Sequence, residues 1–255
     1  MQKDFDGLTK IDHSIKRLKD NEPKDGYYLA FSGGKDSMVL YDLALKAGVK
    51  FDAHYACGGI DPPELMQFIK INYPDVVWDR PEINFWRELQ KHGLPRRQGR
   101  WCCEIIKEWG GVGRVVLTGV RWQESVRRKQ RKILETCCHN NKWFVNPIID
   151  WTVKEIWEYI KANKMPYCSL YDEGFKRLGC VLCPMETARQ TQIELKRFPK
   201  TALAWKHGAY RYWEKNHSKE SFKNWGTPEA FWQWWLSRKG ERTPKEQCRM
   251  ILGDN

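Results

Sequence analysis

The feature that most constrains the fold is a glycine-rich hexapeptide between an apolar run and an amphipathic run. The apolar run is Tyr27–Phe31, the amphipathic run is Met38–Leu45, and the residues between them read Ser32-Gly33-Gly34-Lys35-Asp36-Ser37. Glycines let backbone N–H groups approach an anion, and a helix start adds partial positive charge. Lys35 supplies a full charge, the serines supply hydroxyl donors, and Asp36 is interpreted as a magnesium ligand or a loop organiser. The pattern predicts a nucleotide phosphate site; the alternative is an ordinary tight turn with an N-cap serine.

Strand-like and helix-like segments alternate from residue 27 onward. The sequence predicts strands at 27–31, 51–56, 76–78, 114–119 and 144–149, with helices between them. This alternation predicts an α/β fold with a doubly wound parallel sheet and a ligand at the carboxyl ends of the strands. We expect an N-terminal helix or arm (1–25), a nucleotide-binding domain (26–185) and a helical, tryptophan-rich C-terminal extension (186–255). The tryptophans of the extension are expected to pack against the sheet rather than stack on bases.

Composition limits the class of protein. A length of 255 residues with 41% hydrophobic residues suits one large core, or one core with a small added domain. No run approaches the ~20 apolar residues of a membrane span, and the first residues lack an apolar segment, so we expect a cytoplasmic protein without a membrane partner. The formal net charge of +12 suits a polyanion, either a nucleic acid or a nucleotide, although solubility alone could account for it. The basic excess gathers between Arg96 and Lys132.

Nine cysteines without a secretion signal indicate metal or redox chemistry rather than disulfides. The strongest set combines an adjacent pair with a Cys-x-x-Cys: Cys102, Cys103, Cys180 and Cys183. Four thiolates suit tetrahedral zinc or a [4Fe–4S] cluster. We favour the cluster, because adjacent cysteines rarely chelate one small ion without strain. Four unligated buried thiols are the third alternative.

The remaining cysteines carry weaker signals. Cys137 and Cys138 suit buried core, or a persulfide relay, and Cys168 has no evident partner. Cys248 lies near the end of the chain, where a mobile tail could carry a thiol into a site; otherwise it is simply exposed.

A second candidate nucleotide contact follows the strand predicted at 114–119. Gly119 would permit close approach of a ligand, and Arg121 could bind a phosphate with two N–H groups. Glu124 would orient an arginine rather than contact the anion. The basic residues that follow could instead be a solvated helix face, above all Lys129 and Lys132.

Several ordered blocks together resemble the phosphoadenosine phosphosulfate reductase family, within the adenine nucleotide alpha-hydrolase (PP-loop) superfamily. The blocks are Ser32–Ser37, Gly58–Glu64, Thr118–Ser125, Pro147–Trp151 and Arg177–Pro184. The resemblance implies a parallel sheet of five or more strands with flanking helices. The four-cysteine set looks like the [4Fe–4S] set of adenylylsulfate reductases.

Two departures from the reductases shape the functional hypothesis. The tail reads Glu246-Gln247-Cys248-Arg249 and lacks the Gly-Leu-His that follows the nucleophilic cysteine of those enzymes. The chain also keeps the full Ser32–Ser37 loop, which resembles ATP pyrophosphatases such as those of DNA phosphorothioation and the iron–sulfur tRNA thiolases. The resemblance implies an ATP- and Mg-dependent sulfurtransferase with a nucleic-acid substrate and a sulfur-donor protein.

Two other functions remain open at this stage. One is a sulfonucleotide reductase, with Cys248 as nucleophile and thioredoxin or glutathione as reductant. The other is a non-catalytic subunit that binds a nucleotide or nucleic acid. The acceptor, the sulfur source and homo-oligomer formation are not decided by the sequence.

Overall fold

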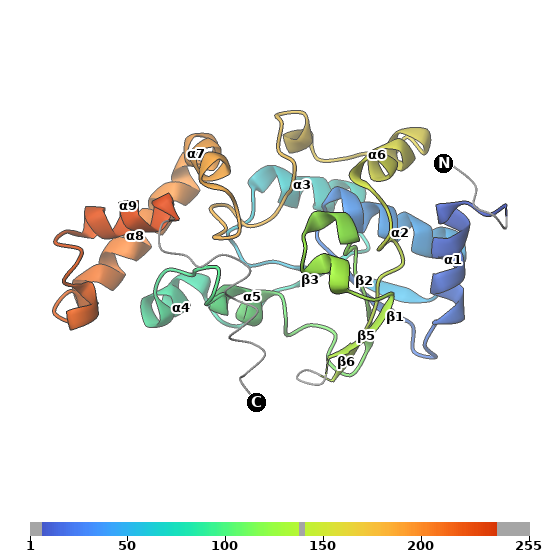
Figure 1. Cartoon of the computed structure of the whole chain (residues 1–255), viewed down its shortest axis with the longest axis horizontal. Helices are drawn as coiled ribbons and strands as arrows, with labels where there is room; N and C mark the ends of the chain where they lie inside the picture. Colours follow the sequence, from blue (N-terminus) through green and yellow to red (C-terminus); the bar gives the residue numbers. More distant parts are fainter. Residues whose placement is uncertain (1–6, 138–140, 239–255) are drawn as a thin grey trace. The chain divides into compact units, whose positions relative to one another are not determined.

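The computed structural model describes residues 7–137 and 141–238 and contains one six-stranded sheet (Figure 1). The spatial order of its strands is β3-β2-β1-β4-β6-β5. The strands are β1 (Tyr27–Phe31), β2 (Phe51–Ala56), β3 (Val77–Asp79), β4 (Val115–Leu117), β5 (Leu134–Cys137) and β6 (Lys142–Val145). All neighbouring pairs are parallel except β5 and β6, which are antiparallel. The predicted α/β fold is confirmed, with one antiparallel strand at the edge.

The strand order reverses beside β1. The chain runs from β1 outward to β2 and β3, then returns to place β4 on the other side of β1. In open α/β sheets such a reversal leaves a crevice at the carboxyl ends of the strands. The fold therefore places the end of β1, where the glycine-rich turn begins, and the end of β4 at the expected ligand position.

Helices occupy most of the remaining regular structure. They are α1 (Lys10–Asp20), α2 (Lys35–Ala47), α3 (Pro63–Asn72), α4 (Phe85–His92), α5 (Trp101–Ile106), α6 (Val153–Ala162), α7 (Ala188–Arg197), α8 (Pro199–Asn216) and α9 (Pro228–Ser237). The predicted capping box at Thr152 is present, since its hydroxyl accepts from the Glu155 N–H and the Glu155 carboxylate accepts from the Thr152 N–H. None of the helices in the described ranges is both long and apolar enough to cross a membrane.

The strand predicted at 144–149 is β6, which ends earlier, at Val145. The Asn146 N–H donates to the Ile133 carbonyl (2.8 Å) instead of continuing the β4–β6 ladder. Pro147 then lacks an N–H to offer a neighbouring strand. Ile133 directly precedes β5, a strand that the sequence analysis does not predict.

By their internal contacts the described residues form two compact units. Unit 1 comprises residues 7–57, 63–80 and 109–179, and it contains the whole sheet. Unit 2 comprises 58–62, 81–108 and 180–238, with α4, α5, α7, α8 and α9. The domain boundaries expected from the sequence, after residues 25 and 185, stay a prediction.

In unit 1 a buried layer joins α1 and α2 to the sheet. The Tyr27 hydroxyl of β1 donates to the Leu18 carbonyl of α1 (2.8 Å), and the Trp151 indole donates to Ser14 Oγ (3.1 Å). Leu29 and Leu40 have no exposed surface. This packing fixes α2, and with it the glycine-rich turn at its N-terminus.

The tryptophans of unit 2 pack on one another and on α4. Trp205 of α8 stacks on Trp235 of α9 (ring centroids 5.1 Å apart) and meets Phe85 of α4 edge to face (5.0 Å). Trp225 contacts Trp234 (4.6 Å). The sequence suggests the sheet as their partner, whereas these contacts are made among α4, α8, α9 and the loop before α9. A helical, tryptophan-rich region is nevertheless present as expected.

Candidate functional site

The glycine-rich turn is held in shape by its own serines. Ser37 Oγ donates to the Gly34 carbonyl (2.9 Å) and accepts from the Ser32 N–H (3.1 Å). The Ser32 hydroxyl lies 3.2 Å from Ser37 Oγ. Gly34 is the N-cap residue of α2 and provides no side-chain cap, so acceptors for the first N–H groups of this helix must come from other residues or from a ligand.

Gly33 is required at its position for two reasons. Its φ is +67°, in the left-handed region. A Cβ there would also lie 2.7 Å from a side-chain carbon of Ile69 and 2.8 Å from one of Leu65, both on α3. The turn can therefore pack against α3 only where residue 33 has no side chain.

The Asp36 carboxylate forms ion pairs with two cationic side chains. Its Oδ1 accepts from Arg121 Nε (2.7 Å), and its Oδ2 accepts from Lys35 Nζ (3.1 Å). Arg121 is almost fully buried and also donates to the Trp151 carbonyl (3.3 Å). Both carboxylate oxygens are thus engaged, which fits the interpretation of Asp36 as a loop organiser better than that of a magnesium ligand.

Further arginines surround this pair. Glu124 lies 3.7 Å from Arg121 Nη2 and forms an ion pair with Arg128. Partial burial, followed by repulsion from Arg177 and Arg131, lowers the pKa of Arg128 to about 10. Such crowding of like charge favours the binding of an anion, since an anion relieves the repulsion.

Gly119 lies where β4 passes the start of α2. A Cβ on Gly119 would be 3.1 Å from the carbonyl carbon of Asp36. The close approach at Gly119 is therefore to the backbone of α2. A contact between Gly119 and a nucleotide stays a prediction.

Tyr171 is a site residue that the sequence reasoning missed. Its hydroxyl accepts from the Lys35 N–H (2.9 Å), and the Lys35 ammonium lies 5.8 Å from its ring centre. The hydroxyl thus holds a helix N-terminal N–H that a phosphate oxygen could use. An aromatic residue 136 positions away in the chain gave no sequence signal of this contact.

The four predicted metal-binding cysteines all lie in unit 2 and interact electrostatically. Cys102 and Cys103 belong to α5, and Cys180 and Cys183 belong to the loop before α7. A hydrogen bond from the Cys102 thiol, then the charges of Lys107 and Arg100, lower the pKa of Cys103 below its usual value.

The same hydrogen bond, together with burial, raises the pKa of Cys102. The negative charges of the Cys180 and Cys183 thiolates raise it further. Burial raises the pKa of Cys180 to about 12 against the opposing effect of Lys107, which hydrogen-bonds its thiol. Lys107, four residues after Cys103, is the second residue that sequence reasoning missed.

The Cys180–Cys183 loop is anchored by α7 and by the end of α9. Leu182 has a φ of +60°, and its N–H donates to Glu194 of α7 (2.6 Å). Arg238 donates to the carbonyls of Leu182 (3.2 Å) and Cys183 (3.4 Å). These bonds hold an unfavourable backbone conformation in place.

Whether the thiols fit a metal can be judged from their arrangement. In the described ranges, no three or more His, Cys, Asp or Glu side chains are grouped so that they could hold a metal ion. Four thiols in one unit are nevertheless the donor type that an iron–sulfur cluster uses, and a cluster at these positions stays a prediction. A cluster spreads its irons over several corners, so it needs wider ligand spacing than one ion does.

The roles predicted for the remaining cysteines are not tested by the structure. Cys138 and Cys248 lie outside the described residues, and Cys137 is known only as the last residue of β5. Cys168 is buried in unit 1, and burial raises its pKa.

The comparison with protein families agrees with this geometry. Residues 26–186, more than half of the chain, match the family model described as phosphoadenosine phosphosulfate reductase domain. The chain belongs to this family.

The proteins to which this chain is similar have different names and lengths. The chain is 32% identical over 225 residues to an uncharacterized protein of Methanocaldococcus jannaschii, covering 81% of this chain and 45% of that protein. It is 28% identical over 188 residues to the adenosine 5'-phosphosulfate reductase of Oceanobacillus iheyensis, covering 68% of this chain and 77% of that protein. The chain spans about half the length of the two M. jannaschii relatives that it matches.

A solved structure supports the fold of this family member. The FMN adenylyltransferase of Candida glabrata, in complex with FAD and inorganic pyrophosphate, aligns with a TM-score of 0.50 at 16% identity. The alignment covers 68% of this chain and 62% of that one.

Proposed function

We propose that this chain binds Mg-ATP at the Ser32–Ser37 turn and uses it to adenylate a nucleic-acid acceptor for sulfur insertion. The observation that carries the proposal is the intact turn surrounded by cations. Lys35 lies at the turn, Arg121 is paired to Asp36, and the charges of Arg128 and Arg177 repel each other nearby. A triphosphate, with its β- and γ-phosphates, would make fuller use of this charge than a nucleotide monophosphate ester.

The proposed reaction has two steps without net oxidation or reduction. An oxygen of the acceptor attacks the α-phosphorus of ATP, the bond to the β-phosphate oxygen breaks, and pyrophosphate leaves with the electron pair. Hydrosulfide, which a sulfur-donor protein releases by hydrolysis of a thiocarboxylate and therefore without a reductant, then attacks the acceptor carbon. AMP leaves with the acceptor's oxygen. Gly33, Gly34, Lys35 and Ser37 would hold the pyrophosphate, while Asp36 positions Lys35 and Arg121.

The family resemblance also supports a [4Fe–4S] cluster at Cys102, Cys103, Cys180 and Cys183, with zinc as the alternative. When bound, a cluster would supply a redox-active centre and a covalent link between α5 and the Cys180–Cys183 loop. Anaerobic purification followed by metal analysis and spectroscopy tests this part. Broad visible absorbance with bound iron and sulfide is expected; a colourless protein holding stoichiometric zinc would contradict it.

The adenylation step is tested with labelled ATP and cellular RNA or DNA as acceptor. Wild-type protein is expected to release pyrophosphate and AMP, and Lys35→Met is expected to lower the rate roughly 10²-fold. Lys46→Met is the matched control, because Lys46 is also on α2 but pairs with Asp42 (2.8 Å) at the other end of the helix. Tight ATP binding without any pyrophosphate release would indicate the non-catalytic alternative.

A second candidate is favoured by the relatives named adenosine 5'-phosphosulfate reductase. In that reaction the Cys248 thiolate attacks the sulfur of adenylylsulfate, AMP leaves, and the dithiol of thioredoxin then releases sulfite. Sulfite formation from adenylylsulfate that is lost in Cys248→Ser, together with indifference to ATP, would replace the first proposal by this one.

A further inference from the structure

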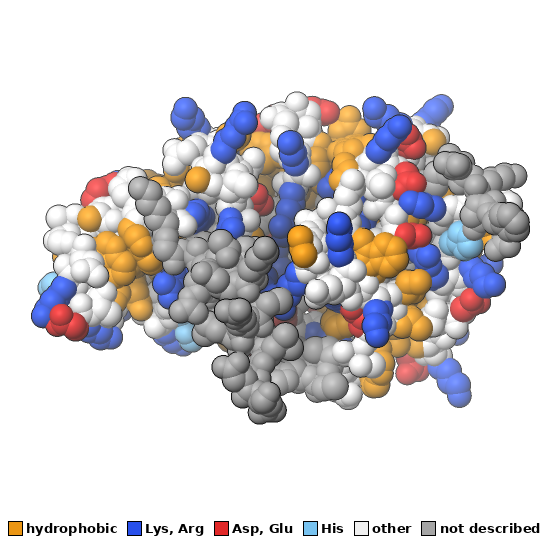
Figure 2. Space-filling model, in the orientation of Figure 1, with side chains coloured by type: hydrophobic (Ala, Val, Ile, Leu, Met, Phe, Trp, Pro, Cys, Tyr) orange, Lys and Arg blue, Asp and Glu red, His pale blue; other side chains and the backbone are white. Residues whose placement is uncertain are grey.

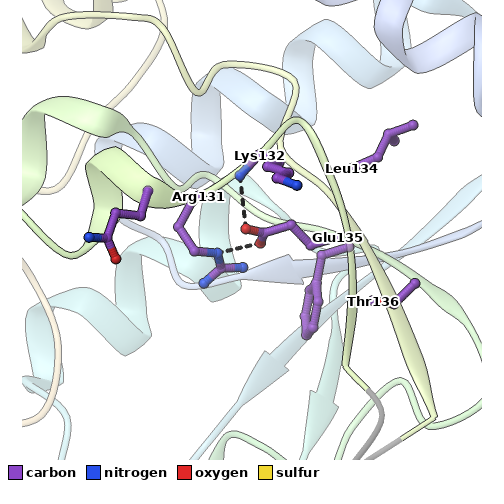
Figure 3. A pocket seen from close by; sticks show the side chains of 7 residues that line it. Arg131, Lys132, Leu134, Glu135 and Thr136 are labelled. Atoms are coloured by element: carbon purple, nitrogen blue, oxygen red, sulfur yellow. Dashed lines mark hydrogen bonds and ion pairs between the residues drawn. The ribbon is translucent and has the colours of Figure 1, made fainter. Parts of the chain in front are cut away.

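A pocket beside the edge strand β5 is not used by the proposed ATP chemistry. It has a volume of about 520 Å³ and lies entirely in unit 1. Its lining consists of Gln130, Arg131, Lys132, Leu134, Glu135, Thr136 and Phe144. Figure 3 shows the Arg131 side chain and the Lys132 backbone N–H both directed at the Glu135 carboxylate. The Arg131 guanidinium also lies 5.7 Å from the centre of the Phe144 ring.

This lining combines flat surfaces with hydrogen-bonding groups. Phe144 and the planar guanidinium of Arg131 are surfaces on which a base can stack. Gln130 and Thr136 are exposed and offer an amide and a hydroxyl, while the Glu135 carboxylate holds the Arg131 guanidinium and the Lys132 N–H in place. Stacking planes with polar groups at their rim are the means by which proteins hold an unstacked nucleobase.

The surroundings of the pocket suit a polyanionic strand. Five of the six residues at 127–132 are cationic: Arg127, Arg128, Lys129, Arg131 and Lys132. Two tryptophans near them are unusually exposed, Trp122 at 39% and Trp143 at 44%. Trp143 of β6 pairs with Thr136 of β5, whereas Phe144 pairs with Glu135, so the Trp143 indole lies on the sheet face opposite the Phe144 ring. Lys and Arg side chains are widespread on the face drawn in Figure 2.

The pocket is also connected to the glycine-rich turn through charged side chains of the same unit. Glu124 contacts both Arg121 and Arg128, and Arg121 is bonded to Asp36. The charge of Arg128 in turn interacts with that of Arg131, which lines the pocket. An acceptor held in the pocket would therefore have cations along its path to the turn.

We propose that the β5 pocket and the basic segment 127–132 bind single-stranded nucleic acid, with one unpaired base in the pocket and the adjoining phosphates on the basic segment. The identification of this strand as the acceptor rests on the proposed function; the binding itself does not. A protein strand added to the edge of β5 is disfavoured, because β5 has only four residues and is preceded by charged residues.

The test measures binding of fluorescein-labelled single-stranded RNA and DNA to the full-length, anaerobically purified protein by anisotropy at several salt concentrations. Lys129→Ala/Lys132→Ala is expected to weaken binding and to reduce the salt dependence by about two counterions. Phe144→Ala is expected to weaken it roughly fivefold or more through lost base stacking. Lys16→Ala/Lys19→Ala removes the same charge from exposed positions of α1 and is expected to bind with the salt dependence of wild type.

Photo-crosslinking of a 4-thiouridine RNA to the wild-type protein needs no substitution, so misfolding of a variant cannot affect this measurement. Crosslinks are expected in peptides that contain residues 130–136 or 143–144. Equal binding by the wild type and both pocket variants, or crosslinks confined to other segments, would overturn the inference. So would a change of self-association in the variants without a change in RNA binding, because the surface would then be a contact between copies.

The two proposals fail in different ways. If nucleic acid binds and the variants weaken it as expected, but no pyrophosphate is released, the pocket assignment stands and the adenylation proposal fails. Pyrophosphate release that depends on nucleic acid, but is unchanged in the pocket variants, would retain adenylation and remove the pocket assignment.

Discussion

At the residue scale, the glycine-rich turn is organised by its own polar groups before any ligand is considered. Asp36 accepts from both Lys35 and Arg121, and Tyr171 accepts from the Lys35 N–H. A ligand with several anionic oxygens would have to compete with these acceptors for the same donors. Such preorganisation lowers the reorganisation needed on binding, although each exchange of partners offsets part of the gain.

The Tyr171 hydroxyl gives the first prediction. Tyr171→Phe removes an acceptor that occupies the Lys35 N–H, so we expect ATP or pyrophosphate to bind up to about fivefold more tightly, equivalent to about 1 kcal/mol. Isothermal titration calorimetry measures the change. Tyr167→Phe is the matched control, because its hydroxyl bonds to Asp172 (3.1 Å) in the same loop. Weaker binding by Tyr171→Phe would show that the hydroxyl contacts the nucleotide instead.

Gly33 gives the second prediction. Gly33→Ala must accept a left-handed backbone and place a methyl group against Leu65 and Ile69, so we expect a loss of about 2–5 kcal/mol in unfolding free energy. Gly48→Ala, at the other end of α2, has φ +69° and nothing within 4 Å of the added Cβ. It should lose only about 1–2 kcal/mol. Equal losses in urea denaturation would mean that α3 moves away without cost.

At the element scale, the Cys180–Cys183 loop depends on α7 for its conformation. Glu194 accepts from the Leu182 N–H at a point where the backbone is left-handed, and its side chain is nine-tenths buried. Burial raises the pKa of Glu194 from 4.5 to about 7. The folded state therefore favours the protonated carboxyl, which the unfolded chain does not.

A pH dependence of stability follows from this shift. The contribution of Glu194 is fully present below pH 4.5 and is lost as the pH rises through about 7, amounting to about 3 kcal/mol. Glu194→Gln keeps an acceptor for Leu182 but cannot ionise, so it should be more stable than wild type at pH 8 and similar at pH 5. Chemical denaturation at both values checks this, with Glu214→Gln on the exposed face of α8 as control. The same difference at both pH values would contradict it.

The elements that local sequence signals predicted were those with caps and clear periodicity. The capping box of α6 and the left-handed Gly48 after α2 formed as expected. In contrast, β5 and α5 lack such signals: β5 is a four-residue edge strand beside a basic segment, and α5 has only six residues. Their conformation depends on partners, which are β6 for β5 and the neighbouring loops of unit 2 for α5.

At the scale of the whole molecule, the two candidate centres belong to different units. The glycine-rich turn and the arginines around it lie in unit 1, and the four cysteines lie in unit 2. Unit 2 is discontinuous in sequence, since residues 58–62, 81–108 and 180–238 contribute to it. A metal centre that links α5 to the Cys180–Cys183 loop would join two of these segments directly.

Removal of the metal centre should therefore affect the units unequally. After chelation or oxidation of anaerobically prepared protein, we expect faster hydrogen exchange in peptides from 81–108 and 180–238, and little change in peptides from 27–56. Mg-ATP should have the reverse effect, protecting peptides that contain 32–37. A uniform increase in exchange across both units on metal loss would contradict this separation.

The sequence by itself determined the α/β class, the strand–turn–helix at 27–47 and the family, because each rests on local pattern or on ordered motifs close in the chain. Only the tertiary structure decided that Arg121 pairs with Asp36, that Tyr171 holds the Lys35 N–H, and that Lys107 approaches Cys180. It also decided that residues 81–108 belong with the C-terminal helices. The physical reason is that hydrogen bonds and ion pairs form between groups close in space, and the distance along the chain between such groups is set by the fold.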